Sequence, residues 1–323
     1  MKSHPAGSPV DSFKSGCVAI IGRPNVGKST LINRLLGTAV SIVTPKAQTT
    51  RDRVLGILTE PEKGQLVFID TPGIHRAKEG GLNQVMVREA QDALEGPDLV
   101  WYLLDPSSAP EHEKGVLELL KGVQAPIYLI LNKSDAKYFD SERNDQFLER
   151  LRAEGESLGL KFEKTFQISA KRGDCVEELV NASWEKIPVG EMLYPDPDQI
   201  SDRPIRFFVA EKIREQLLMC LGEEVPYCCA VEIVNFNENS KPVRIEAVIH
   251  VERDSQKGIV IGKGGSKIRE IGQNARAQIE EFLGTPIFLG LQAHVLKDWS
   301  RDARSLERLG YHLPKPSDQR RRA

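Results

Sequence analysis

Short, strongly apolar runs alternate with polar stretches through the first half of the chain. Five runs have the length and character of strands: residues 17–21, 65–70, 98–104, 126–131 and 165–168. Several are continuously apolar, which is typical of parallel strands covered on both faces. Between them, apolar residues recur at helical spacing. The pattern predicts an α/β domain over residues 16–187, with a mostly parallel sheet and helices on both faces.

The pattern changes after residues 188–204, a stretch rich in proline and acidic residues that has the composition of a linker. Beyond it, the periodicity predicts a helix, two strands, two helices and a strand, in that order. The corresponding stretches are 205–221, 229–233, 245–251, the residues on either side of 261–265, and 287–295. We therefore predict a smaller α+β domain over residues 205–311, ending in a helix, and flexible polar tails at 1–15 and 312–323.

A glycine-bounded loop follows the first predicted strand. Residues 22–30, G-R-P-N-V-G-K-S-T, fit the P-loop pattern G-x-x-x-x-G-K-[ST]. Between a strand and a helix, the backbone N–H groups of such a loop point at phosphates. We expect Lys28 to reach the β- and γ-phosphates and Ser29 to ligate Mg2+. An ordinary glycine-rich turn is the alternative. The residues predicted to line the phosphates are Gly22, Asn25, Val26, Gly27, Lys28, Ser29 and Thr30.

A second motif, D-T-P-G at residues 70–73, follows the strand at 65–70. Ligands of parallel α/β sheets bind at the carboxyl ends of the strands, so this motif and the P-loop belong to one site. Asp70 is expected to hold Mg2+ through water, and Gly73 to present its N–H to the γ-phosphate. In isolation, the same four residues form only a turn.

Two further motifs predict a pocket for guanine. Residues 132–135, N-K-S-D, follow the strand at 126–131, and Ser169, Ala170 and Lys171 follow the last strand of the domain. Guanine presents two donors, N1–H and the N2 amine, so a carboxylate at Asp135 accepts two hydrogen bonds that adenine cannot offer. Lys133 can lie along the base, Asn132 can tie the loop to the P-loop, and the N–H groups of 169–171 can bond the guanine carbonyl.

A long connection at residues 38–53 contains A-Q-T-T-R. Long loops inside compact domains are often functional. A threonine here can complete the Mg2+ shell and sense the γ-phosphate, but composition does not separate Thr49 from Thr50. A plain polar loop is the alternative.

In the second half, residues 261–271 resemble the KH-domain pattern I-G-x-x-G-x-x-I-x-x-I, and the element order resembles the type II KH fold. The glycines of such a loop let it lie against a single-stranded RNA backbone. The alternative is a helix–loop–helix with a glycine C-cap. The residues predicted to contact RNA are Gly262, Lys263, Gly264, Gly265, Lys267 and Arg269.

The overall composition neither supports nor opposes an RNA-binding domain. The chain is 40% apolar and 28% charged with a net charge of −2, which is typical of a globular protein and says nothing for nucleic acid. Locally, however, residues 257–269 carry four cations and no acid. The five cysteines form no C-x-x-C pair, so we expect reduced thiols. No apolar run is long enough for a transmembrane helix, and residues 1–15 lack the apolar core of a signal peptide.

Taken in order, the five motifs of the first domain resemble those of the translational-factor-like GTPases, and their residues resemble the Era family in particular. The resemblance implies GTP/GDP and Mg2+ as cofactors and Thr50 as the switch threonine. It assigns catalysis to Lys28, Thr50 and Gly73, and metal binding to Ser29, Thr50 and Asp70. Position 74 is isoleucine, where many GTPases carry a glutamine that orients the attacking water.

The resemblance implies an enzyme that hydrolyses GTP slowly when alone, because Ile74 cannot orient water. His75 can be proposed as a base, although a solvated loop histidine is the simpler interpretation.

The family further implies a cytoplasmic monomer, able to associate peripherally with the cytoplasmic face of the membrane. Its implied partners are 16S rRNA near the 3′ end and the 30S subunit, whose assembly it serves. The alternatives are a related GTPase acting on tRNA and an RNA-binding module with a vestigial nucleotide site. The basic tail, Lys315 and residues 320–322, contacts RNA or aids solubility.

Overall fold

The computed structural model describes residues 13–44, 46, 49–73, 81–222 and 224–311. The chain divides into two compact units. The first contains the described parts of 1–40, 53–75 and 90–202, and the second those of 41–52, 76–89 and 203–323. Two segments from the N-terminal half thus belong to the second unit, which the predicted domain limits did not anticipate. No helix among the described residues is long and apolar enough to cross a membrane.

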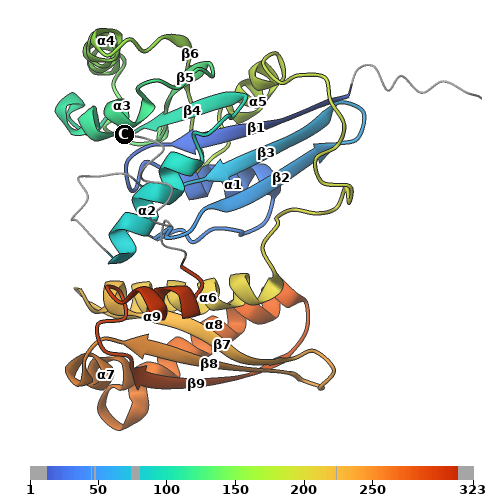
Figure 1. Ribbon diagram of the computed structural model, residues 1–323, viewed down its shortest axis with the longest axis vertical. Coiled ribbons are helices and arrows are strands. Elements are labelled where there is room, and N and C mark those ends of the chain that lie inside the picture. The colour runs from blue at the N-terminus through green and yellow to red at the C-terminus, as the bar shows by residue number, and fades with distance from the viewer. Residues whose placement is uncertain (1–12, 45, 47–48, 74–80, 223, 312–323) are drawn as a thin grey trace, which may run out of the picture. The chain divides into compact units, whose positions relative to one another are not determined.

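The first unit is built on a six-stranded sheet with the order β2-β3-β1-β4-β5-β6 (Figure 1). Its strands are β1 Lys14–Ile21, β2 Val54–Glu60, β3 Gly64–Asp70, β4 Leu99–Leu104, β5 Ile127–Leu131 and β6 Phe162–Gln167. All neighbouring pairs are parallel except β2 with β3. The predicted mostly parallel sheet is therefore confirmed. The edge strand β2 was missed because its residues are only partly buried and lack the continuous apolar character of the inner strands.

Helices cover both faces of this sheet. They are α1 Lys28–Leu36, α3 Lys114–Leu120, α4 Ser141–Ser157 and α5 Val176–Trp184, with the short 3-10 helix η2 Pro110–Glu113 before α3. A further helix, α2 Gly81–Asp92, lies between β3 and β4 in the chain. Apolar side chains of α3 and α4 form one core with those of β1, β4 and β5. On the opposite face α5 contacts β4, where the Trp101 indole donates a hydrogen bond to Ser183. The first part of α2, up to residue 89, belongs to the second unit.

The second unit has the predicted order of helix, strand, strand, helix, helix and strand. Its main elements are α6 Ile205–Cys220, β7 Ala230–Asn237, β8 Val243–Val251, α7 Asp254–Ile261, α8 Ser266–Leu283, β9 Ile287–Val295 and α9 Ala303–Arg308, with the 3-10 helices η3 Val225–Cys228 and η4 Lys263–Gly265. β8 pairs antiparallel with β7 and parallel with β9. Helices α6 and α8 pack on one face of this sheet. The smaller α+β fold is thus confirmed, and all five cysteines are free.

Candidate nucleotide site and RNA-binding loop

The P-loop lies between β1 and α1 and has room only for glycine at its two ends. Gly27 has a φ of 105°, and a Cβ there would lie 2.2 Å from Asn132 Nδ2. A Cβ on Gly22 would lie 2.4 Å from the carbonyl oxygen of Leu103. Since both positions lack space for any side chain, the two glycines of the motif are required by packing as well as by backbone angle.

Lys28 lies beneath this loop with only 6% of its surface exposed. Its Nζ donates hydrogen bonds of 2.9 Å to the carbonyl oxygens of Gly22 and Arg23. Burial lowers the pKa of Lys28 to about 8, although Asp70 and Glu113 oppose that shift. The ammonium group is therefore held by the same loop whose N–H groups would cradle phosphates, and an anionic ligand would favour its charged form further.

Ser29 and Asp70 meet at the carboxyl ends of β1 and β3. The Ser29 hydroxyl donates a hydrogen bond of 2.9 Å to Asp70 Oδ2, and the aspartate is fully buried. A hydroxyl and a carboxylate are the oxygen ligands that Mg2+ prefers. The two side chains therefore fit the magnesium role predicted for them.

Gly73 lies directly against the P-loop. A Cβ at this position would approach the backbone N and Cα of Pro24 to 2.6 Å. The backbone of Gly73 thus lies next to the loop that would carry the phosphates, at a position with no room for a side chain. The next two residues, Ile74 and His75, lie outside the described part of the chain.

Asn132 joins three of the predicted loops. Its Nδ2 donates a hydrogen bond of 2.7 Å to the carbonyl oxygen of Val26 in the P-loop. Its Oδ1 accepts one of 2.8 Å from the backbone N–H of Ala170. Because the side chain is 2% exposed, these bonds fix the phosphate loop relative to the base-pocket loops.

Asp135 is oriented by the last motif. Its Oδ1 accepts a hydrogen bond of 2.7 Å from the Ser169 hydroxyl, which lowers the pKa of the aspartate. Lys133 has a left-handed φ of 67° and donates from Nζ to Asp105 Oδ2 at 2.7 Å. The carboxylate that would read guanine is thus ionised and held in place before the base arrives.

Two contributors to the base pocket were missed by the sequence analysis. Asp105 follows β4, so the rule that placed the other motifs after strands would have found it. Burial raises the pKa of Asp105, but hydrogen bonds from Lys133 and Ser107 outweigh it and lower the pKa. Arg34 on α1 donates to the carbonyl oxygens of Ala170 and Lys171. No sequence pattern marks Arg34, because its partners lie more than a hundred residues away.

Thr50 belongs to the second unit and is 8% exposed. Both of its neighbours are bonded to the small domain. Arg214 on α6 donates to the carbonyl oxygen of Thr49. Arg51, 4% exposed, donates to the carbonyl oxygens of Cys229 at 2.7 Å and Tyr227 at 2.9 Å, where η3 ends. The predicted switch threonine therefore lies in a segment that is anchored to the domain carrying the G-x-x-G loop.

Arg51 also contacts the aromatic core of this unit. Its guanidinium carbon lies 5.9 Å from the ring centroid of Trp299, which is fully buried. The Trp299 indole in turn donates to the carbonyl oxygen of Cys228, next to the carbonyl groups that Arg51 binds. A guanidinium group satisfied by several carbonyl groups and an aromatic face is a rigid anchor rather than a loose surface contact.

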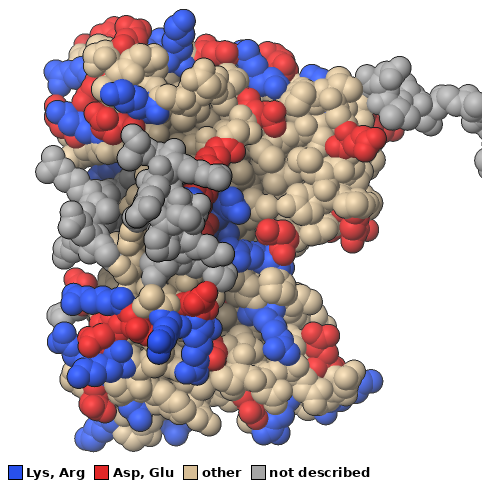
Figure 2. Space-filling view, viewed as in Figure 1, with Lys and Arg blue, Asp and Glu red and all other residues tan. Residues whose placement is uncertain are grey.

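The G-x-x-G loop lies between α7 and α8. Gly262, Gly264 and Gly265 all have left-handed φ values, 71°, 60° and 76°. No atom lies within 4 Å of a Cβ built on Gly264 or Gly265, so the backbone there is open to a ligand. Lys267 pairs with Glu270 at 2.8 Å. Figure 2 shows cations and acids intermixed over the face that it draws.

The fold and these loops define a class of protein, a P-loop GTPase domain joined to a KH domain. Two family models match the chain, 50S ribosome-binding GTPase over residues 17–133 and KH domain over residues 224–300. GTPase Era of Geobacter sp. (strain M21) is 46% identical over 301 residues, which cover 93% of this chain and 98% of that protein. GTPase Era of Xanthomonas campestris pv. campestris (strain B100) is 42% identical over 304 residues, covering 94% and 99%.

Two solved structures agree with these relatives. One is a variant of Aquifex aeolicus Era bound to GDP.AlF4-, and the other is Era in complex with MgGDPNP and nucleotides 1506–1542 of 16S ribosomal RNA. Each has a TM-score of 0.86 and 37% sequence identity, over 93% of this chain and 100% of that chain. The chain belongs to the Era family of GTPases, enzymes that bind and hydrolyse GTP. This confirms the resemblance and sets aside a vestigial nucleotide site.

Proposed function

We propose that this GTPase is a timing switch that binds single-stranded ribosomal RNA through its KH loop and acts in 30S subunit assembly and 16S rRNA maturation. The observation that carries the proposal is the open, left-handed backbone of the G-x-x-G loop, on a chain that covers all of an Era structure holding 16S rRNA nucleotides 1506–1542. A cytoplasmic monomer with peripheral membrane contact remains part of this proposal.

In the GTP-bound state, Mg2+ would be held by Ser29, by Thr50 and, through water, by Asp70. The ion would neutralise charge on the β- and γ-phosphates. Lys28 and the N–H of Gly73 would contact the γ-phosphate, and Asp135 would accept from N1–H and the N2 amine of guanine. The bond between Ser29 and Asp70 supports the metal assignment, since the two oxygens are already together.

Hydrolysis without an activator is expected to be slow. Position 74, next to Gly73, is an isoleucine that can neither donate nor accept a hydrogen bond. The attacking water must be oriented by backbone, by Mg2+ or by a group supplied from outside. A site that binds GTP tightly but lacks a side chain to orient the attacking water is typical of a slow molecular switch rather than of a fast catalyst.

The RNA recovered from the protein in its GTP-bound state tests the proposal directly. Crosslinking followed by sequencing should yield 16S rRNA near its 3′ end. Crosslinks concentrated on tRNA would instead support the alternative of a GTPase acting in tRNA modification.

Replacing Gly264 by aspartate should weaken binding of single-stranded RNA by at least tenfold and leave GTP affinity unchanged. A side chain at this open position would obstruct the approach of the RNA backbone, and its charge would repel the phosphates. Fluorescence anisotropy with a labelled oligonucleotide measures the first quantity, and nucleotide titration the second.

The matched control is Gly264→Asn, which has nearly the same size and tolerates the φ of 60° without a charge. Its affinity should fall between those of the wild type and the aspartate variant. If the aspartate variant binds RNA like the wild type, the loop is misassigned.

Nucleotide state and RNA affinity are proposed to be coupled through residues 49–51. Thr50 would respond to the γ-phosphate and Mg2+, while Thr49 and Arg51 are bonded to carbonyl and guanidinium groups of the KH-domain unit. Because Arg51 is the next residue in the chain, a rearrangement of Thr50 on GTP binding would shift Arg51 and alter its hydrogen bonds to the KH-domain unit.

The coupling can be tested with Arg51→Met, which keeps most of the stem but removes every hydrogen bond of the guanidinium group. We expect the ratio of RNA affinities between the GDPNP- and GDP-bound forms, about 5- to 150-fold for typical coupled sites, to fall to about one. Arg152→Met is the control, because Arg152 lies on α4 in the first unit and donates a hydrogen bond to Thr165 of the same unit. An unchanged ratio in Arg51→Met would exclude this route of coupling.

A further inference from the structure

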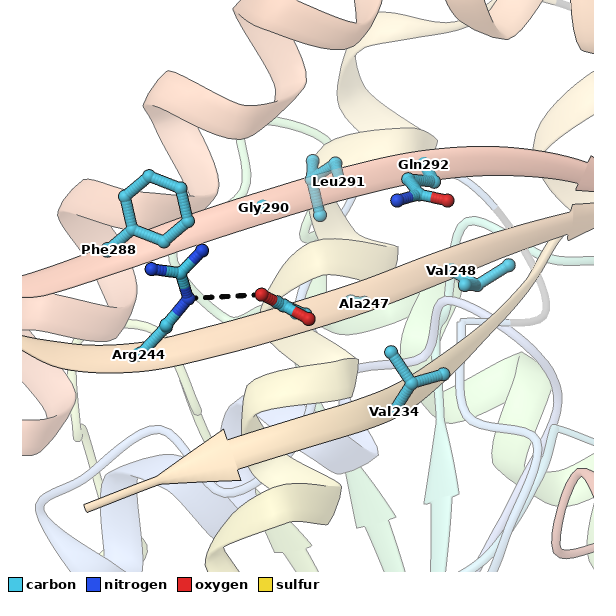
Figure 3. Close-up of a pocket in the computed structure, with 9 residues that line it drawn as sticks. Val234, Arg244, Ala247, Val248, Phe288, Gly290, Leu291 and Gln292 are labelled. Atoms are coloured by element: carbon cyan, nitrogen blue, oxygen red, sulfur yellow. Dashed lines mark hydrogen bonds and ion pairs between the residues drawn. The ribbon is translucent and has the colours of Figure 1, made fainter. Parts of the chain in front are cut away.

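The sheet of the KH domain has a second face, opposite to the one on which α6 and α8 pack. Helix α9 reaches part of this face, where Arg308 pairs with Glu232 of β7. Successive residues of a strand point to opposite faces. Ile245 and Ala247 of β8 belong to the core beneath α6 and α8, so their neighbours face the other way. A hollow of about 270 Å³ lies on that outward face (Figure 3). Its walls include Arg244, Glu246, Val248, Phe288, Gly290 and Gln292.

The register of the strands places these residues in three facing pairs. Arg244 lies beside Phe288, Glu246 beside Gly290, and Val248 beside Gln292. Gly290 is therefore at the centre, and the hollow exists because this position carries no side chain. A Cβ there would make ordinary contacts, 3.5 Å to the Phe288 ring and 3.6 Å to Glu246 Cγ. A larger side chain at this position would therefore fit without a clash and would lie against the walls of the hollow.

The walls combine flat, apolar and polar groups. The Phe288 ring is 46% exposed, and the Arg244 guanidinium lies 4.7 Å from its centroid. Glu246 holds that guanidinium at 3.0 Å, and Figure 3 shows the pair lying beside the ring. Gln292 adds an amide that can donate and accept. An aromatic ring and an arginine plane for stacking, with a carboxylate and an amide for edge hydrogen bonds, are the groups that read an unstacked nucleobase.

We propose that this hollow binds one unpaired nucleobase of the RNA that the KH loop holds by its backbone. The inference rests on the proposed RNA binding. A KH loop clamps about four nucleotides, whereas the RNA in the related Era complex spans nucleotides 1506–1542. Most nucleotides of such an RNA therefore lie outside the KH loop, and some of them can reach other surfaces of the domain, such as this hollow.

One strand, β9, contributes both to the hollow and to the core that packs beside the KH loop. β9 is an edge strand of the sheet, in the order β7-β8-β9. On its inner side, Leu291 and Ala293 share a cluster with Ile261 and Ile268, which flank the G-x-x-G loop. Its outer side forms a wall of the hollow. An RNA strand leaving the loop needs only to pass the edge of β9 to reach it.

A protein partner fits this face less well. Only two large apolar side chains of the hollow are half exposed, Phe288 and the bulge residue Val234. That is little for the apolar core of a protein interface, which needs a patch of several hundred Å² on each partner. A single planar base, in contrast, needs only one aromatic ring for stacking and a few polar groups for hydrogen bonds to its edge.

The test uses two variants that act in opposite ways. Phe288→Leu keeps an apolar side chain but removes the flat ring. Gly290→Val fills the hollow with a residue that strands favour, so the domain should remain folded. Binding is measured with two RNAs, a segment matching nucleotides 1506–1542 and a five-nucleotide single strand that only the KH loop can hold.

Both variants should bind the long RNA about 5- to 100-fold more weakly, the effect of losing one stacked base, and the short RNA unchanged. Unchanged affinity for the long RNA would overturn the proposal. An equal loss for both RNAs would also overturn it, since the change would then act through the KH loop. If both RNAs bind normally but binding to 30S subunits weakens, the hollow serves a ribosomal protein instead. A wild type that binds neither RNA would refute the proposed function itself.

Discussion

Asp135→Asn is expected to weaken GTP binding by about 10²- to 10⁴-fold. The carboxylate would accept two hydrogen bonds from guanine, and each bond to a charged group is worth about 1.5–3 kcal/mol. Asparagine turns one of these acceptors into a donor that faces the guanine amine. The hydrogen bond from Ser169 keeps the wild-type carboxylate ionised and oriented. Both hydrogen bonds from guanine should therefore contribute in the wild type, and the variant should lose their contribution. Isothermal titration with GTP measures the change.

The same variant should gain affinity for xanthosine triphosphate, because the asparagine amide can donate to the oxygen that replaces the guanine amine. Asp145→Asn is the matched control, since Asp145 is an exposed residue of α4. Unchanged GTP affinity in Asp135→Asn would refute the assignment of the base pocket.

Lys28→Ala should lower GTP turnover by about 10²- to 10³-fold, the cost of removing one preorganised charge from a developing phosphoryl transition state. The ammonium group lies under the P-loop, held by the carbonyl oxygens of Gly22 and Arg23. Phosphate release under single-turnover conditions, with GTP above its dissociation constant, separates this effect from weaker binding.

Lys121→Ala serves as the control for Lys28, because Lys121 is exposed at the end of α3. Circular dichroism should show the same fold for both variants. Equal turnover in Lys28→Ala and wild type would mean that the P-loop lysine takes no part in hydrolysis.

Much of the nucleotide site was predictable because its motifs are contiguous. A glycine-bounded loop after an apolar strand has few other uses, and the D-T-P-G and N-K-S-D motifs follow strands in the same way. The structure brings Ser29 against Asp70 and Asn132 against the P-loop, as one site requires. The catalytic roles of Lys28 and Gly73 stay predictions that the variants above test.

Other features escaped prediction because they depend on distant partners or on weak patterns. Strand β2 lacks a continuous apolar run, and several of its side chains are only partly buried. Arg34 contacts a loop more than a hundred residues away. The hollow beside Gly290 depends on the register of β8 and β9, which the alternation of each strand does not determine.

The sequence by itself determined the fold class and marked the residues that we expect to bind GTP and RNA, because strand and helix periodicity and short phosphate- or RNA-binding motifs are local properties of the chain. Only the tertiary structure decided where residues 41–52 belong. Arg51 bonds to Cys229, 178 residues away, and Arg214 to Thr49, 165 residues away. Backbone carbonyl groups are the same at every position, so no residue pattern marks which of them a buried arginine will bind. That choice follows from packing alone.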